Sequence, residues 1–333
     1  MTDLVEKAMP QILAELDPHS TYIPAQKLEE VNSELEGSFS GIGIQFTIQE
    51  DTIHVNSVIP GGPSEKVGLM AGDRIVMVND SLFAGKGLTN EKAMRNLKGP
   101  KGSQVKLGVK RATEKELLDF TITRGDIPQN TIDAAYMLDD DYGYIQISKF
   151  GRTTHVELLN AIAQLSHEKC KGLIIDLRDN PGGWVNDAQS IADIFLDKGT
   201  LCYLQYKNGE RYYYRTKDGK VEMQLVILVN ENSASSSEIL TGALRDRANA
   251  TVVGKKTYGK GIVQSVVPLS DGSGMQITVA QYYTPNGYAV HKQGITPDVE
   301  VDGDNGMYEL GDLTDAQLAK ALEVMQEKLA EKK

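Results

Sequence analysis

The sequence predicts an α+β multidomain protein in which a small β-barrel is inserted ahead of an α/β core. Its length of 333 residues is enough for two domains of about 150 residues each. From residue 37 to residue 125, short segments alternate apolar and polar residues, which indicates half-buried strands. From residue 126 onwards, apolar runs alternate with helical stretches, which is typical of a sheet covered on both faces. With a helical segment at each end, the expected segments are 1–36, 37–125, 126–303 and 304–333.

Composition and charge exclude several classes of protein. The 35 Lys and Arg against 46 Asp and Glu give a net charge of −11 without a basic stripe, which argues against a nucleic-acid partner. No stretch approaches the ~18 apolar residues of a membrane-spanning helix. The two cysteines, Cys170 and Cys202, match no metal or redox spacing, although they leave a single disulfide open. The cysteine spacing therefore indicates neither a cysteine metal site nor a disulfide framework.

The first segment, residues 1–36, is expected to contain two helices. Apolar residues recur at helical spacing until Asp17-Pro18-His19-Ser20 breaks the pattern. A second, short helix is expected from about Ala25 to Leu35. The first helix begins without a cap or lead-in, which indicates a chain trimmed at its N-terminus. The acidic start carries no secretory signal, so it fits either a cytoplasmic protein or an exported one whose leader is missing.

The barrel segment contains a glycine loop that leads into a strand. Gly41-Ile42-Gly43-Ile44 comes first, and Gly68-Leu69-Met70-Ala71-Gly72-Asp73-Arg74-Ile75 follows at a later turn. Glycines let backbone N–H groups converge on an anion, and an exposed strand edge accepts an extended peptide. The two segments resemble those of PDZ domains, which implies that Gly41, Ile42, Gly43 and Ile44 bind the terminal carboxylate of a peptide. The plainer alternative is a glycine-rich hairpin in some other barrel.

The core segment is expected to alternate strands and helices. Strands are predicted over residues 143–147, 172–177, 201–214, 225–229 and 277–283, and helices over 155–165, 186–196 and 235–247. The tyrosines between residues 201 and 214 are interpreted as strand packing rather than as a binding surface. Residues 314–332 carry the apolar stripe of an amphipathic helix.

Ser235 lies where a buried strand meets a helix. At such a junction, free N–H groups and the helix dipole favour developing negative charge, as in a nucleophile elbow. The spacing Ser235-x-x-Glu238 also fits a capping box, which would merely start the helix. On these residues alone, both interpretations stand.

Lys260 is the candidate base for that serine. A serine nucleophile needs a base, and the five histidines lie in no Ser-His-Asp or zinc signature. Lys260 stands between Gly259 and Gly261 at the start of a predicted strand, where an apolar environment would favour the neutral amine. An exposed hairpin lysine is the alternative.

Several motifs in a fixed order resemble one enzyme family. The segment from Ser233 to Ile239, with Lys260 25 positions after Ser235 and Gln264 four beyond, is similar to the carboxyl-terminal processing proteases, S41 serine peptidases with a PDZ domain. The resemblance covers about Leu16 to Val301. Three more segments are similar to those of the family: Leu16-Asp17-Pro18-His19-Ser20-Thr21-Tyr22, Gly172-Leu173-Ile174-Ile175-Asp176-Leu177-Arg178-Asp179-Asn180-Pro181-Gly182-Gly183 and Gly294-Ile295-Thr296-Pro297-Asp298.

The resemblance implies a ClpP/crotonase-like α/β core with a Ser–Lys dyad, and it implies no metal and no cofactor. Ser235 would be the nucleophile, Lys260 the general base, and Gln264 the residue that orients the lysine amine. Four residues of extended strand span about 13 Å, so Gln264 can assist only if the chain bends at Lys260 or if it acts from an adjacent position. The oxyanion would bind the amide of Ser236 and that of Gly182 or Gly183. Ser236 stands where the family commonly has alanine.

The predicted function is that of a serine endopeptidase that selects polypeptides through their C-terminal tails. The expected partners are polypeptides with free apolar C-termini and no nucleic acid; a homo-oligomer or an activating adaptor stays open. The family resemblance implies an extracytoplasmic location, in the periplasm or cell envelope. One alternative is a catalytically inactive PDZ adaptor on a protease-like core, which the retained Ser235, Lys260 and Gln264 disfavour. Another is a crotonase-like acyl-CoA enzyme, which the PDZ insertion disfavours. Asp176 and Arg178 are interpreted as an ion pair at a strand end.

Overall fold

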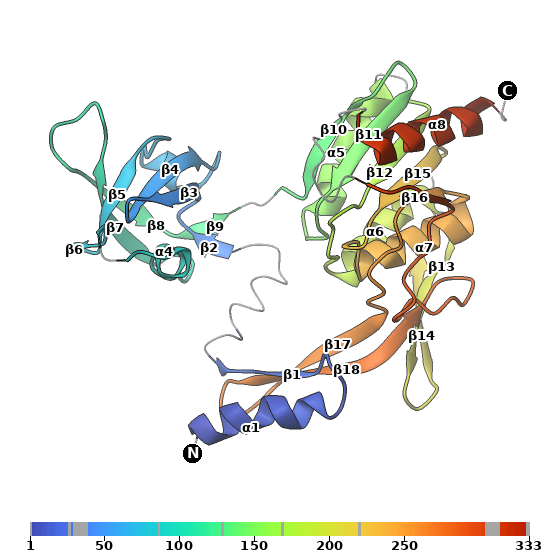
Figure 1. The fold of residues 1–333 in the computed structure, drawn as a ribbon, viewed down its shortest axis with the longest axis horizontal. Helices are drawn as coiled ribbons and strands as arrows, with labels where there is room; N and C mark the ends of the chain where they lie inside the picture. Colours follow the sequence, from blue (N-terminus) through green and yellow to red (C-terminus); the bar gives the residue numbers. More distant parts are fainter. Residues whose placement is uncertain are drawn as a thin grey trace. The chain divides into compact units, whose positions relative to one another are not determined.

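The computed structural model describes residues 2–25, 28, 39–85, 87–127, 130–167, 170–218, 221–303 and 314–330. They form two compact units, one of residues 36–129 and one of residues 1–35 together with 130–333 (Figure 1). The predicted helix from Ala25 to Leu35 lies almost entirely outside the described residues. No described helix is both long and apolar enough to cross a membrane.

The smaller unit is built on a sheet of short antiparallel strands. Its order is β3 (Ile44–Gln49), β4 (Thr52–Val58), β5 (Arg74–Val78), β7 (Gln104–Lys110) and β8 (Leu118–Thr123), with β6 (Ser81–Leu82) on β5. A separate pair joins β2 (Phe39–Gly41) to β9 (Gly125–Ile127), and the helices are α3 (Pro63–Lys66) and α4 (Asn90–Leu97). Alternate residues such as Ile53 and Val55 enter the core, as the sequence pattern predicts. Among the described strands, β3 and β8 end the sheet, so β3 has an open edge.

The larger unit contains a mostly parallel sheet. The order is β10 (Ile132–Met137), β11 (Tyr142–Ile147), β12 (Gly172–Asp176), β15 (Gln224–Val229), β16 (Thr251–Gly254) and β19 (Val299–Glu300), and only β10 pairs antiparallel. One face packs on α5 (Thr154–His167), α6 (Val185–Phe195) and α7 (Ser236–Ala248). The other face packs on α8 (Ala316–Ala330) (Figure 1). Both faces are therefore buried, which explains the continuous apolar runs.

A second sheet of the larger unit joins an N-terminal strand to strands from the second half of the chain. Its order is β1 (Thr21–Ile23), β18 (Gly274–Tyr283), β13 (Gly199–Tyr206) and β14 (Arg211–Thr216), and β17 (Ile262–Pro268) also pairs with β18. The N-terminal helix α1 (Thr2–Ala14) leads into β1, which pairs with residues 274–276. The predicted tyrosine packing is present: Tyr203 stacks on Tyr283 with ring centroids 5.0 Å apart.

A buried ion-pair network fixes α8 to the parallel sheet. Arg178, 2% exposed, binds Asp176 and also Asp315 just before α8, each at 2.6 Å. The Tyr144 hydroxyl donates to Asp176 at 2.7 Å. Although burial lowers the pKa of Arg178, the two carboxylates raise it above its ordinary value. The predicted ion pair at the strand end is thus present and extends to the C-terminal helix.

Asp315→Ala is expected to lower the free energy of unfolding by about 3–5 kcal/mol, because it leaves a buried guanidinium with one carboxylate in place of two. Urea denaturation measures the change. Lys320→Ala is the control, since it breaks the exposed Lys320–Glu323 pair of the same helix and should cost less than about 1 kcal/mol. Equal losses in the two variants would contradict this account of how α8 is held.

Candidate active site

Ser235 lies in a sharp turn between β15 and α7. Its backbone has φ +56° and ψ −116°, a left-handed conformation that non-glycine residues rarely adopt. The turn is fixed by buried hydroxyls, since the Ser233 Oγ donates to the Leu177 carbonyl at 2.7 Å. Ser235 is only half-buried. The turn is therefore a strained elbow that presents a serine at the start of a helix, and the capping box of Ser235 and Glu238 is present as well, so both features proposed for this segment occur.

Glu238, on the first turn of α7, lies at the centre of the site. Its fully buried carboxylate accepts the N–H groups of Ser235 and Lys260 on one oxygen, each at 2.9 Å. The other oxygen accepts the Gly259 N–H at 2.7 Å and the Thr257 hydroxyl at 2.5 Å. Burial raises the pKa of Glu238, and these donors oppose that shift. A single carboxylate thus holds the backbones of Ser235 and Lys260 side by side.

Lys260 lies in a glycine-flanked loop just before β17. The loop is fixed on one side by the Tyr258 N–H, which donates to the Ser233 carbonyl at 3.0 Å. It is fixed on the other side by Lys292, whose N–H donates to the Gly259 carbonyl at 2.9 Å. The Lys260 side chain is half-buried, and its ammonium makes no hydrogen bond or ion pair with another described residue. The backbone of Lys260 is therefore held beside that of Ser235 by Glu238.

The two candidate oxyanion glycines differ in their hydrogen bonds. The Gly182 N–H donates to the Asn180 side chain at 2.9 Å and is therefore occupied. No acceptor in the described part of the chain binds the N–H of Gly183 or that of Ser236. The loop packs closely against the start of α7. A Cβ added to Gly182 would lie only 2.9 Å from the Ser236 nitrogen. These contacts favour Gly183 over Gly182 as the partner of Ser236.

The hydrogen bonds of the Gln264 amide go to residues other than Lys260. Gln264 lies in β17, and its side chain donates to the His19 carbonyl at 2.6 Å and accepts from Gln276 at 2.9 Å. The His19 turn is in turn held by Asp17, whose carboxylate binds the Ser20 hydroxyl at 2.6 Å. Lys260 lies before β17, and the Gln264 amide, within β17, makes its hydrogen bonds to His19 and Gln276. Gln264 therefore connects β17 to the N-terminal turn.

The predicted carboxylate loop lies at the start of the open-edged strand β3. The carbonyls of Ile42 and Gly43 accept the N–H groups of Ser64 and Ile59 at 2.9 and 3.1 Å, which holds the loop against the turn before α3. Gly43 has φ +76°, and a Cβ there would lie 3.1 Å from Ile127. An edge strand has unpaired backbone groups that can pair with an added strand.

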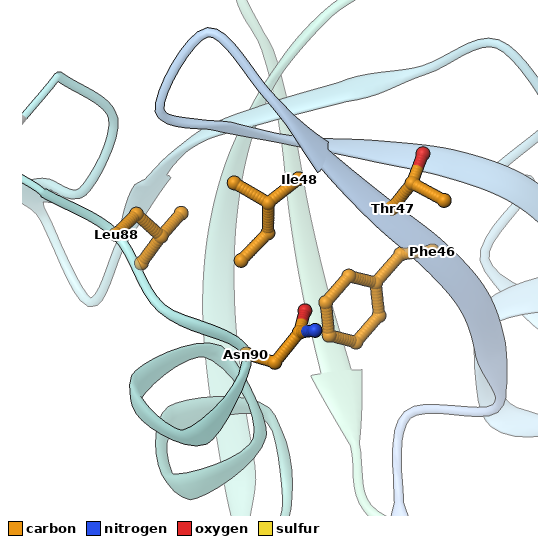
Figure 2. Close-up of a pocket in the computed structure, with 5 residues that line it drawn as sticks. All are labelled: Phe46, Thr47, Ile48, Leu88 and Asn90. Carbon is orange, nitrogen blue, oxygen red and sulfur yellow. The ribbon is translucent and has the colours of Figure 1, made fainter.

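A cavity of about 370 Å³ lies between β3 and the start of α4 in the same unit. Figure 2 shows the Phe46 and Ile48 side chains on the side of β3 that faces Leu88 and Asn90. The lining combines the apolar Phe46, Ile48 and Leu88 with the polar Thr47 and Asn90. Such a mixed surface next to an open strand edge suits an extended peptide.

Two features of the site lie beyond the sequence-based assignments. Glu238 was expected to be a helix cap at most, and its bonds to Gly259 and Lys260 across the fold are invisible to local spacing. Tyr282, fully buried in β18, donates its hydroxyl to the Ser235 carbonyl at 3.1 Å. The described residues contain no cluster of three or more His, Cys, Asp or Glu that could hold a metal ion.

Comparison with known proteins gives one consistent family. Residues 141–301 match Peptidase family S41, and residues 40–123 match the PDZ domain. The chain is 35% identical to the carboxy-terminal-processing protease of Bartonella bacilliformis over 90% of its own length and 70% of that protein's. It is 37% identical to carboxy-terminal processing protease CtpA of Bacillus subtilis, of which it spans 64%. Among solved structures, it resembles the photosystem II D1 C-terminal processing protease, with a TM-score of 0.59 and 29% identity over 98% of this chain and 86% of that one. The chain therefore belongs to the carboxy-terminal processing proteases, the serine peptidases of family S41.

Proposed function

We propose that this chain is an endopeptidase that uses a Ser235–Lys260 dyad and selects polypeptides through their C-terminal tails. The observation that carries the proposal is the Glu238 carboxylate, one oxygen of which binds the N–H groups of both Ser235 and Lys260. Such an arrangement keeps a nucleophile and a base adjacent without a histidine or a metal ion. The PDZ match over residues 40–123 supports tail capture by the smaller unit.

In the proposed reaction, the neutral Lys260 amine takes the proton of the Ser235 hydroxyl as its oxygen attacks the scissile carbonyl. The resulting oxyanion binds the N–H groups of Gly183 and Ser236. When the C–N bond breaks, the leaving amine receives the proton from the Lys260 ammonium, and an acyl-enzyme ester forms on Ser235. Water then attacks the ester, with Lys260 again accepting and returning a proton, and the N-terminal fragment leaves as a carboxylic acid.

Gln264 is assigned a positioning role in this scheme. Both polar atoms of its amide are bonded, to His19 and to Gln276, so it orients Lys260 through β17 rather than by direct contact. A core arranged as in ClpP and crotonase belongs to the same proposal, as do an extracytoplasmic location and a homo-oligomer or activating adaptor.

Cleavage of a polypeptide that ends in a free apolar tail tests the proposal against that of an inactive adaptor. The wild-type chain should cleave it, and Ser235→Ala should not, although both bind the tail equally. Alanine removes the attacking oxygen and costs at most a helix cap, about 1 kcal/mol of stability. Tail binding without cleavage by either protein would show an adaptor instead.

Amidation of the peptide's C-terminus is expected to weaken binding about 10-fold, because the loop at Gly41–Ile44 loses charge-assisted hydrogen bonds to the carboxylate. Isothermal titration of Ser235→Ala protein with the acid and the amide of one peptide measures the difference without cleavage. The acid and the amide of a second peptide with a charged last residue serve as a control. They test whether the apolar side chains that line the cavity contribute to binding. Equal affinity for acid and amide would exclude carboxylate recognition by this loop.

A further inference from the structure

Ser236 connects the two segments that supply the proposed oxyanion donors. Its side chain is fully buried, and its Oγ donates to the Gly183 carbonyl at 2.8 Å. The neighbouring Ser233 and Ser237 bind the carbonyls of Leu177 and Asn180, earlier in the same loop. Ser236 is therefore the serine of this group whose hydroxyl reaches the glycine with the free N–H.

Gly183 needs such an anchor because its own backbone is permissive. It has φ +151°, and a Cβ would lie 1.9 Å from the Phe150 carbonyl oxygen, so a side chain cannot restrain it. The peptide plane before it, which contains the Gly183 N–H, is fixed by the Phe150 N–H, which donates to the Gly182 carbonyl at 2.9 Å. The plane after it is fixed by the Ser236 hydroxyl. Both planes around Gly183 are thus bonded to residues outside the loop, where an isolated β-bridge also pairs Gly183 with Phe150.

We propose that Ser236 is a positioning residue for catalysis. Its hydroxyl fixes Gly183 so that the Gly183 N–H and the Ser236 N–H point to the same oxyanion. The inference rests on the proposed function, because it takes Ser235 as the nucleophile. It adds a role for the Ser236 side chain that is separate from the role of the Ser236 backbone. Ser236 is fully buried, whereas Gly183 is exposed, so the bond joins the buried start of α7 to the exposed glycine loop.

The test compares Ser236→Ala with Thr241→Val. Thr241 is equally buried on the same helix, and its hydroxyl also donates to a carbonyl, that of Ser237, at 2.7 Å. Each variant loses one hydrogen bond from a side-chain hydroxyl to a backbone carbonyl, but only Ser236→Ala removes a bond to Gly183. The measurements are kcat and KM for peptide cleavage, the melting temperature, and inhibition by a peptide boronic acid, whose tetrahedral adduct places an oxygen in the oxyanion position.

We expect Ser236→Ala to lower kcat about 3- to 10-fold with unchanged KM, and to weaken boronate inhibition by a similar factor. Thr241→Val should change the melting temperature by a similar amount and leave both kcat and boronate inhibition unchanged. Equal kinetics in the two variants, or a Ser236→Ala effect on KM alone, would overturn the positioning role. Complete loss of activity in Ser236→Ala with retained activity in Ser235→Ala would instead overturn the proposed function, because Ser236 would then be the nucleophile.

Discussion

Lys260→Arg is expected to lower kcat/KM for peptide cleavage by about 10³-fold, within the range attributed to general acid–base catalysis. Arginine keeps a positive charge of similar reach, but its guanidinium does not lose its proton at any usable pH and so cannot accept one from Ser235. The loop itself should tolerate the change, since the Gly259 and Lys260 N–H groups that bind Glu238 are backbone groups. Steady-state kinetics from pH 6 to pH 10 measure the loss.

Lys255→Arg is the matched control for that experiment. Lys255 lies in the segment that leads to the same loop, and it reaches Glu231 at 3.9 Å through a partly exposed side chain. It should therefore keep wild-type kinetics. Substantial cleavage by Lys260→Arg at any pH would exclude lysine as the base. The candidate bases would then be the histidines, of which His291 lies in the segment that packs against Gly259 and Gly261.

Glu238→Gln is expected to lower kcat by at least about 100-fold and the free energy of unfolding by about 1–3 kcal/mol, the range for a buried polar group that loses its partner. Glutamine has the same shape, but one carboxylate oxygen becomes an NH₂ group that faces N–H or O–H donors. Either the Ser235 and Lys260 amides or the Thr257 and Gly259 donors then lack an acceptor. The turn and the lysine loop should separate, which a structural cap alone would not require.

The measurement is kcat together with urea denaturation, and Glu231→Gln is its control. Glu231 lies in the same β15–α7 connection but is exposed, so Glu231→Gln should change neither kcat nor stability. A Glu238→Gln variant that loses stability but keeps kcat would show that Glu238 only caps α7. Rescue of activity at low temperature, where the fold is intact, would point the same way.

The strands and their faces could be predicted because burial leaves a periodic pattern in the sequence. Alternation gave β3 and β4, and the continuous runs gave β12 and β15. Helix α7 was predicted to within a residue, because a strand, small polar residues and an apolar helix follow each other directly. The turn at Ser235 could therefore be predicted from local sequence, whereas the choice between a nucleophile elbow and a helix cap could not.

The connections across the site could not be predicted in the same way. A Ser-x-x-Glu spacing is the same for a helix cap and for a residue that binds a loop 22 positions away, so the bond from Lys260 to Glu238 has no local signal. Gln264 binds the carbonyl of His19, 245 residues earlier, and no spacing rule indicates that pairing. The choice between Gly182 and Gly183 depends on the Asn180 side chain, which is oriented by its hydrogen bond to the Ile147 carbonyl, 33 residues earlier.

The most direct test of the Ser235–Lys260 mechanism is to map the covalent adduct of a serine-directed peptide phosphonate by mass spectrometry. The turn contains four serines, Ser233, Ser235, Ser236 and Ser237, so the site of attachment identifies the nucleophile. The mechanism predicts one adduct per chain, on Ser235, formed by the wild-type protein and by Lys255→Arg but not by Lys260→Arg. An adduct on another serine, or one that forms on Ser235 equally fast without Lys260, would contradict it.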